Sequence, residues 1–471
     1  MFVVCAAVFL SVLNGTIVNV VLPTIGLELA VEPALLGWVV TAYSLVYAVA
    51  IPFFGRFADI FGARRLFVAG QAVFALGSLL CVLAPSFPLL VLARVIQAAG
   101  GAAIPGLGMT LATRAYPPHQ IGVVVGLMST GVGVAQAIGP TLGGVVATAF
   151  GWQAAFAVGT LAGVLVPASW VWLPQLDRKP DDATSTREPL DLWGGLFLAA
   201  TISGGLLALT EAARHGPGAP TVWLAALLAL IGLASLVFRQ RTNTFPFIPR
   251  EVLASPAFLA VSGITVCSTA SSFGVIVGVP LLLARVNGLP ASEIGLLMIP
   301  NALLAVSLGV LVGKLADRVG IRLPVRAGLL ALLVSLAALS TAAGMSGWII
   351  SGLLAVLGVG TTLVYTALPA SVSLILRPER LASGQGINSM LFFLGGSLGA
   401  TLTTAVLTVR AEAADALNLI HSGSGVPFSD AFLLLMVPVA LGLTLTGWVP
   451  GRPPTDRSSS DTMRPTSVPG E

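Results

Sequence analysis

The sequence contains little charge. Of its 471 residues only 9% are Asp, Glu, Lys or Arg, whereas soluble globular domains carry about 25%. Hydrophobic residues make up 56% of the chain. A soluble protein of this length cannot bury so much apolar surface. The composition therefore excludes a soluble globule and predicts an all-α integral membrane protein, whose solvent is lipid.

Residues in the arrangements typical of catalytic or metal sites are also scarce. The three cysteines, Cys5, Cys81 and Cys267, lie in apolar stretches without the spacing of a disulfide framework or a zinc site. The sequence offers no paired carboxylates, no His-metal cluster and no nucleophile–base pair near one membrane interface. No Lys/Arg cluster is dense enough to follow nucleic-acid phosphates. We therefore expect no enzyme, no metal, no cofactor and no nucleic-acid partner.

Long apolar runs recur along the whole chain, bounded by charges or by Pro/Gly turns. Each is about 17–25 residues long, which is enough to cross a bilayer as a helix. We predict fourteen spans, at residues 1–23, 36–54, 66–84, 88–112, 122–149, 153–173, 193–213, 219–238, 257–283, 291–313, 324–343, 347–370, 384–408 and 430–450.

The basic residues between these runs are distributed unevenly. If the first span runs outward, nineteen of the 23 Lys and Arg residues face the cytoplasm. Three, Arg214, Arg285 and Arg410, face outward, and Arg94 remains inside a span. Positive charge is normally retained on the inner side. We therefore expect a multi-pass protein of the cell membrane with both termini in the cytoplasm.

One short motif occurs twice. GRFADIFGARR follows the second predicted span at residues 55–65, and GKLADRVGIR follows the tenth at residues 313–322. Equivalent positions in two halves predict two six-helix bundles related by a pseudo-two-fold axis, with two helices inserted between them. The expected divisions are 1–174 for the N-terminal bundle, 175–256 for a cytoplasmic linker, the inserted helices and the next inner loop, 257–450 for the C-terminal bundle and 451–471 for a disordered cytoplasmic tail.

Four further motifs lie at defined depths in the predicted spans. They are LNGTIVNVVLP (13–23), LARVIQAAGGAA (92–103), GVGVAQAIGPTLGG (131–144) and GQGINSMLFFLGGSLGA (384–400). With the repeated loop motif, they resemble the signatures of the major facilitator superfamily, in particular its fourteen-helix drug:proton antiporter branch. The resemblance covers nearly the whole chain.

That resemblance implies a secondary active transporter. It would work by alternating access and export small lipophilic or cationic organic molecules, such as drugs, antibiotics or metabolites, in exchange for protons. The alternatives are a related carrier that lacks proton coupling or imports a small solute, a polytopic membrane enzyme, and a membrane scaffold or sensor. The expected partners are a small organic substrate, protons and the bilayer, with the chain acting as a monomer.

The repeated loop motif predicts a latch on the cytoplasmic side. Gly55 and Gly62 permit a tight turn and close helix approach, and Asp59 can accept hydrogen bonds from a helix N-terminus or pair with an arginine. The alternative is a solvated turn whose arginines only obey the positive-inside rule. The expected latch residues are Gly55, Asp59, Gly62, Arg64, Arg65, Gly313, Asp317 and Arg318.

The fifth predicted span is rich in small residues. Glycines at near-four spacing form a groove for a close crossing helix, and a proline removes a backbone hydrogen bond and bends the helix. We expect packing and gating here, with ordinary close packing as the alternative. The residues are Gly131, Gly139, Pro140, Gly143 and Gly144.

Arg94 is the only basic residue deep in a span. Burial of a lone arginine costs at least about 2.5–3.5 kcal/mol, so we expect a polar partner or a cavity, with Gln97 one turn away on the same face. The alternative is that Arg94 extends to the outer interface. Asn14 stands where the resembling family's helix 1 signature has aspartate, and asparagine cannot titrate. No carboxylate lies in the centre of a predicted span, so the sequence does not decide whether transport is coupled to protons. Glu211 is the best candidate for a substitute acid, and the alternative is that it is only an interfacial loop charge.

Other polar side chains in the spans are candidates either for a transport cavity or for interhelical hydrogen bonds. The set suggests a neutral or cationic, largely apolar substrate. It comprises Asn14, Thr16, Asn19, Tyr43, Tyr47, Arg94, Gln97, Gln136, Asn301, Tyr365, Gln385 and Asn388.

Overall fold

The computed structural model is helical throughout the part of the chain that it describes, and no strand occurs there. The described residues are 1–31, 33–36, 38–117, 120–173, 191–216, 218–413, 415–421 and 424–451. The predicted linker at 175–190 and almost all of the predicted tail lie outside them.

Three groups of helices follow one another along the chain. The N-terminal half consists of α1 (Phe2–Glu28), α2 (Pro33–Leu36), α3 (Trp38–Phe61), α4 (Ala63–Val82), α5 (Phe87–Gly101), α6 (Ile104–Ala115), α7 (Ile121–Phe150) and α8 (Trp152–Trp172). The inserted pair is α9 (Leu192–His215) and α10 (Pro220–Thr242). The C-terminal half consists of α11 (Arg250–Ala254), α12 (Pro256–Arg285), α13 (Ala291–Val319), α14 (Arg322–Thr341), α15 (Gly347–Ile375), the 3₁₀ turn η2 (Pro378–Arg380), α16 (Leu381–Val409), α17 (Val426–Leu434), α18 (Met436–Leu445) and the 3₁₀ turn η3 (Thr446–Trp448).

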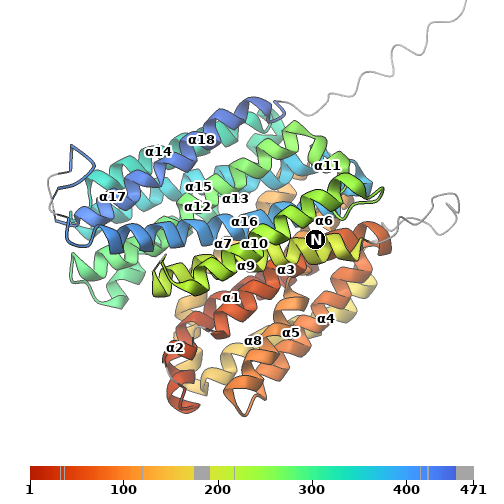
Figure 1. Ribbon diagram of the computed structural model, residues 1–471, viewed down its shortest axis with the longest axis horizontal. Coiled ribbons are helices and arrows are strands. Elements are labelled where there is room, and N and C mark those ends of the chain that lie inside the picture. Colours follow the sequence, from red (N-terminus) through yellow and green to blue (C-terminus); the bar gives the residue numbers. More distant parts are fainter. Residues whose placement is uncertain are drawn as a thin grey trace, which may run out of the picture.

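The two halves lie side by side. In Figure 1, α1, α4, α5 and α8 occupy the lower part of the view, and α14, α15, α17 and α18 occupy the upper part. Across the seam, α7 packs against α13 and α3 packs against α16. The inserted helices α9 and α10 pack on each other, and α9 contacts both α3 and α16. The inserted pair therefore covers part of the seam between the halves.

Eleven helical segments are long and apolar enough to cross a membrane, within the described residues. They coincide with the second to fourth, sixth to ninth and eleventh to fourteenth predicted spans. The other three predicted spans fall on α1, α7 and α13. Of these, α1 and α7 are apolar over their described stretches Phe2–Val18 and Ile121–Ala135. The total of fourteen crossings stays a prediction.

Two predicted spans are interrupted. The span expected at 88–112 consists of α5 and α6, which are separated at Ala102 and Ala103. Pro105 lies in the first turn of α6, where the missing N–H is tolerated but would break a continuous helix. The last span begins at Val426 rather than at residue 430 and is divided at Leu435, directly before a turn that contains Pro438.

The repeated motif ends two helices in the same way. Gly62 follows α3 with φ 97°, and Gly320 follows α13 with φ 85°. A side chain would strain this left-handed backbone, so glycine is needed at both turns. Gly320, the counterpart of Gly62, was absent from the predicted latch, although alignment of the two repeats would have identified it.

Candidate functional site

Arg94 lies on α5 and is enclosed by neutral groups. Its side chain is only 1% exposed. Its Nη1 donates to Oε1 of Gln97, and its Nε donates to the carbonyl oxygen of Val39 at 3.2 Å. The guanidinium carbon lies 3.9 Å from the ring centre of Tyr43 and 5.7 Å from that of Phe156, which are cation–π distances. Arg94 is therefore held inside the bundle and does not extend to the outer interface.

Gln97 connects Arg94 to two more helices. Its Nε2 donates to Oδ1 of Asn14 at 3.0 Å and to Oγ of Ser78 at 2.7 Å. Asn14 in turn donates to the carbonyl oxygen of Ala155 on α8 at 3.4 Å. Asn14, Ser78 and Gln97 are all fully buried. The network of Asn14, Tyr43, Ser78, Arg94 and Gln97, called the Arg94 network below, thus ties together α1, α3, α4 and α5.

The sequence identified four of these five residues but missed Ser78. Ser78 lies on α4 two turns after Gln71, another buried polar residue of the same apolar run, which donates to the carbonyl oxygen of Ala162 and accepts from Ser169. Two polar residues seven positions apart share a helix face. This pattern was the available signal for Ser78.

A row of aromatic rings leads from the Arg94 network across the seam. Tyr43 stacks on Tyr47 with ring centres 5.5 Å apart, and Tyr47 meets Phe393 of α16 edge-on at 4.9 Å. Phe392 continues the row at 5.4 Å from Phe393. Beyond it, Tyr365 on α15 and Phe273 on α12 lie 5.2 Å and 5.7 Å from Phe392. We call Tyr43, Tyr47, Phe273, Tyr365, Phe392 and Phe393 the aromatic row.

The predicted polar residues of the C-terminal half make bonds between helices. Thr265 on α12 donates to Oδ1 of Asn388 on α16 at 2.8 Å. Gln385 on α16 donates to the carbonyl oxygen of Pro369 on α15 at 2.9 Å. The hydroxyl of Tyr365 donates to the backbone of α12 at 3.4 Å. Each of these side chains therefore makes a hydrogen bond between helices, which is the alternative to a transport cavity that the sequence analysis gave for these residues.

Two of the remaining cavity candidates, Thr16 and Asn301, make contacts with other groups. Thr16 donates to the carbonyl oxygen of Leu13 within α1 at 2.9 Å and to that of Ala135 on α7 at 3.4 Å. Asn301 lies on α13, where Gly358 of α15 approaches it closely. The side chains of Asn19 and Gln136 lie outside the described residues.

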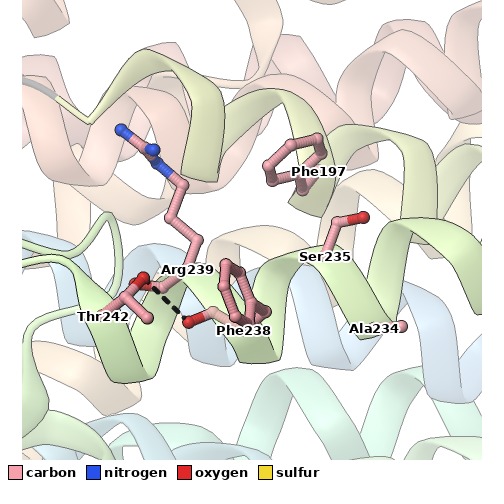
Figure 2. A pocket seen from close by; sticks show the side chains of 6 residues that line it. All are labelled: Phe197, Ala234, Ser235, Phe238, Arg239 and Thr242. Carbon is pink, nitrogen blue, oxygen red and sulfur yellow. Dashed lines mark hydrogen bonds between the residues drawn. The ribbon is translucent and has the colours of Figure 1, made fainter.

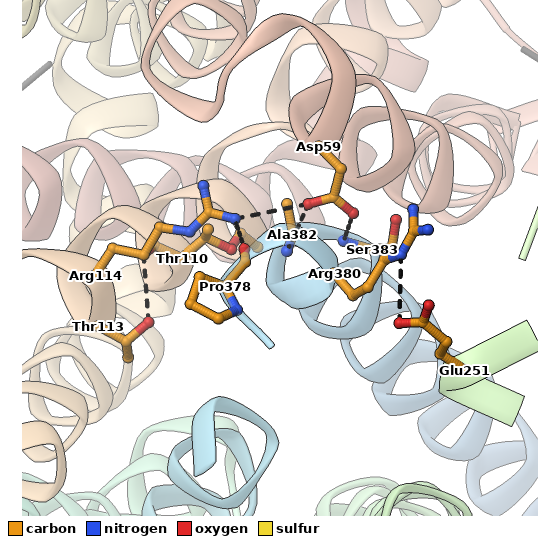
Figure 3. Close-up of polar contacts among 10 residues, drawn as sticks. Asp59, Thr110, Thr113, Arg114, Glu251, Pro378, Arg380, Ala382 and Ser383 are labelled. Atoms are coloured by element: carbon orange, nitrogen blue, oxygen red, sulfur yellow. Dashed lines mark hydrogen bonds and ion pairs between the residues drawn. The ribbon is translucent and has the colours of Figure 1, made fainter. Parts of the chain in front are cut away.

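Asp59 caps a helix of the opposite half (Figure 3). Its two carboxylate oxygens accept from the backbone N–H groups of Ala382 at 3.2 Å and Ser383 at 3.0 Å, in the first turn of α16. Arg114 approaches the same carboxylate at 3.7 Å. Only 2% of the Asp59 side chain is exposed. A carboxylate at this position satisfies unpaired N–H groups and interacts with the positive end of the helix dipole.

Asp317 makes the equivalent contact in the reverse direction. It lies near the end of α13 in the C-terminal half and accepts from the backbone N–H groups of Gly122 at 2.8 Å and Val123 at 3.2 Å. These groups begin α7 of the N-terminal half. The two copies of the sequence motif therefore make two reciprocal helix caps across the seam.

Glycines allow the backbones to touch beside each cap. An added Cβ on Gly55 would lie 2.6 Å from the carbonyl oxygen of Ala382. On Gly122 or Gly313 it would come within 3.0 Å of the other glycine's carbonyl oxygen, and Gly126 has the same relation to Gly309. These separations are shorter than real Cβ contacts, so each crossing requires glycine.

The predicted arginines of the latch do not contact the two aspartates. Arg64 donates to the carbonyl oxygen of Trp170 on α8, and its guanidinium lies 5.1 Å from the centre of the Trp170 ring. Arg65 and Arg318 are exposed. The arginine beside Asp59 is instead Arg114 of α6, which is not among the predicted latch residues.

Along α7 the glycines change partners. Gly122 and Gly126 contact α13, as described above, whereas Gly139 and Gly143 approach Thr16 and Ile17 of α1. Gly131, between them, faces open space. Gly144 lies on the same helix, and the side chain of Pro140 is outside the described residues, so the predicted gating bend stays a prediction.

A surface pocket of about 430 Å³ lies on the inserted pair, and none of its lining residues belongs to the Arg94 network, the aromatic row or the two caps (Figure 2). Arg239 at its rim forms an ion pair with Asp191, with Nε and Oδ1 2.5 Å apart. Asp191 also accepts from the backbone N–H groups of Gly194 at 3.1 Å and Phe247 at 3.2 Å. The lining residues are Phe197, Ala234, Ser235, Phe238, Arg239 and Thr242.

Comparison with known proteins matches this chain to one family model and to several transporters. The family model described as Major Facilitator Superfamily matches residues 4–400. The chain is 32% identical over 312 residues to the uncharacterized transporter YebQ of Escherichia coli (strain K12), covering 66% of this chain and 67% of that protein. It is 29% identical over 401 residues to the multidrug resistance protein Stp of Mycobacterium tuberculosis (strain ATCC 25618 / H37Rv), covering 85% and 74%.

Two further similarities concern other transported molecules. The riboflavin transporter RibZ of Clostridioides difficile (strain 630) is 27% identical over 323 residues, which cover 68% of each protein. The crystal structure of the human organic anion transporter MFSD10 superposes with a TM-score of 0.67 at 15% identity, covering 94% of this chain and 98% of that one. At this identity the similarity concerns the fold alone.

Proposed function

Because the chain belongs to the major facilitator superfamily, we propose that it is a secondary active transporter that exports small, largely apolar organic molecules by alternating access. It is a multi-pass membrane transporter and not an enzyme. The observation that supports alternating access most directly is the pair of reciprocal caps, Asp59 on α16 and Asp317 on α7.

The two caps lie at the same end of the helices. Both follow from the loop motif, which ends α3 and α13 on the side that the basic residues assign to the cytoplasm. Each cap links the N-terminal and C-terminal halves. The proposed moving bodies are the two predicted bundles, residues 1–174 and 257–450. With both caps made, the cytoplasmic side is closed, and the opposite state requires that both break.

The finer parts of the proposal are membership of the fourteen-helix drug:proton antiporter branch, export, and exchange for protons. The five sequence motifs support the branch. The inserted pair α9–α10 agrees with two extra helices between two bundles. Relatives named as a multidrug resistance protein and as a riboflavin transporter support an aromatic or lipophilic substrate.

A carrier without proton coupling is the second candidate function. Asn14, which cannot titrate, lies inside the Arg94 network. Among the described residues of the membrane helices, acidic side chains occur only near helix ends, as with Asp59, Asp317 and Asp430. Proton exchange normally needs an acid within the membrane.

Flux in proteoliposomes tests the proposal. The purified chain would be reconstituted and given a fluorescent aromatic dye, with and without an imposed pH gradient and with a protonophore as control. Dye accumulation that collapses with the protonophore supports antiport. Accumulation that follows only the dye gradient supports the uncoupled carrier. Dye movement no faster than in protein-free liposomes, for a panel of neutral, cationic and anionic dyes, would reject transport of this class.

A further inference from the structure

Arg94 has no acidic partner in the part of the chain that the structure describes. Gln97, Val39, Tyr43 and Phe156 surround its guanidinium, and all four are neutral. Asn14, one hydrogen bond further on, is neutral as well. The Arg94 network therefore carries one unbalanced positive charge at a fully buried position.

The guanidinium also has donor capacity to spare. An arginine offers five N–H groups on three nitrogens. Nε and Nη1 of Arg94 donate to Val39 and Gln97, while Nη2 makes no hydrogen bond to any described residue. Nη2 is therefore a donor that an acceptor on a ligand could use, and a negative charge on that ligand would balance the guanidinium.

A ligand anion would supply both. Hydrogen bonds between ionised partners are roughly twice as strong as neutral ones, and an arginine in low dielectric favours a carboxylate or sulfonate. A ligand cation would meet repulsion from Arg94 instead. The charge of the site thus discriminates between substrates of opposite sign.

The aromatic row indicates the chemistry of the rest of such a ligand. It starts at Tyr43, which covers Arg94, and continues through Tyr47 to Phe393 in the other half. Phe393 lies in the middle of α16 and is 38% exposed. Aromatic side chains at 4.5–7 Å spacing favour stacked or edge-on contact with further rings.

We propose that the Arg94 network binds the acid group of an organic anion, and that the preferred substrate is an aromatic carboxylate or sulfonate whose rings lie along the aromatic row. This inference rests on the proposed transport function and names the charge of its substrate. It differs from the neutral or cationic, largely apolar substrate predicted from the sequence, because that prediction considered the polar side chains without their partners.

A matched pair of fluorescent probes tests the substrate charge. Dansylglycine and dansylcadaverine carry the same aromatic group, the first with a negative and the second with a positive charge. Binding to the detergent-purified full-length chain is measured by dansyl fluorescence, and flux is measured separately in proteoliposomes. We expect the anion to bind at least about tenfold more tightly, as one charge-assisted hydrogen bond predicts.

Variants then locate the preference. Arg94→Gln should weaken dansylglycine binding about ten- to a hundredfold and abolish the preference. Arg94→Lys should keep the sign of the preference. Asn14→Asp leaves Arg94 in place and adds a negative charge to the network, so it should also reduce anion binding. Arg285→Gln, an exposed arginine at the end of α12, is the matched control. Size-exclusion profiles confirm that each variant is folded.

The two readouts separate the two proposals. Preferential anion binding that Arg94→Gln abolishes and Asn14→Asp reduces supports the substrate assignment. If no flux accompanies that binding, the transport proposal fails alone. Flux of dansylcadaverine without dansylglycine leaves transport standing and overturns the anion site. Equal binding of both probes, binding of neither, or a preference that survives in folded Arg94→Gln also overturns it.

Discussion

Asp59 and Asp317 make the same contact in opposite directions. Asp59 of the N-terminal half accepts two backbone N–H groups from the start of α16, and Asp317 of the C-terminal half accepts two from the start of α7. Each aspartate lies four residues after a glycine at which the helix backbones touch, Gly55 or Gly313. The repeated sequence motif therefore encodes a reciprocal contact between the halves.

Neutralisation of Asp59 should weaken closure of the cytoplasmic side. Asp59→Asn removes the negative charge that interacts with the α16 dipole and with Arg114, and such a charge at a helix N-terminus is worth about 0.3–1 kcal/mol, up to about 2 kcal/mol when partly buried. We expect slower transport and a melting temperature lower by a few degrees, measured in proteoliposomes and in detergent. Glu293→Gln, which removes an exposed acid from α13, is the control. Equal effects of the two variants would mean that the cap has no role in transport.

The crossing of α7 and α13 should not tolerate a methyl group. In Gly313→Ala the new Cβ would come within 3.0 Å of the carbonyl oxygen of Gly122, so the helices must separate. We expect lower thermal stability and reduced transport. Gly352→Ala on α15 meets nothing within 4 Å and should be neutral or slightly stabilising, because alanine favours the helix by roughly 0.5–1 kcal/mol. Melting curves of both variants test this, and identical curves would contradict the close crossing.

Asp191 should make the inserted pair sensitive to acid. Burial raises its pKa, but hydrogen bonds from Arg239 and Gly194 lower it more, so the pKa lies below its ordinary value of 3.8. The unfolded chain then takes up the proton first, and the stabilisation is present above about pH 4 and lost as pH falls through the folded-state pKa. Wild type should melt higher than Asp191→Asn at pH 5–7, and the difference should shrink below pH 4. A constant difference would indicate that only the shape of the side chain matters.

Asp430 should hold the loop between α16 and α17. Its side chain, fully buried, accepts from Nε of Arg410 and from the backbone N–H of Leu417, both at 2.7 Å. Hydrogen bonds to charged groups contribute about 1.5–3 kcal/mol, so Asp430→Ala should increase trypsin cleavage after Arg410 by about tenfold or more. In the control Asp415→Ala the backbone carbonyl that meets Arg410 is retained. Unchanged cleavage in folded Asp430→Ala would show that other contacts order this loop.

The helical membrane fold and the contact between an aspartate and a helix N-terminus were predictable, because both follow from local sequence patterns. Apolar runs locate membrane helices since lipid satisfies no backbone polar group. The repeated motif predicted an aspartate at a neighbouring helix N-terminus, but not which helix, since α16 begins 322 residues after Asp59. The pairing of Arg94 with Gln97 was predictable because residues three apart share a helix face.

The remainder of the site depends on packing between distant helices. Ser78, Phe392 and Phe393 are unremarkable in sequence, since serines and phenylalanines are common in membrane spans. Their roles appear only when α4 meets α5 and when α16 meets α3. Likewise, Arg64 was assigned to the latch by its place in the motif. It lies in the first turn of α4, and its side chain donates to the carbonyl oxygen of Trp170 on α8.

The reciprocal caps make closure a two-point attachment. When one aspartate leaves its helix by fluctuation, the other keeps the halves within reach, so the first rebinds as an intramolecular partner at high effective concentration. Separation then requires the coincidence of two openings, and its probability falls roughly as the product of the two. In the proposed alternating-access cycle, such a barrier would rarely open between transport events, although neither contact alone has to be strong.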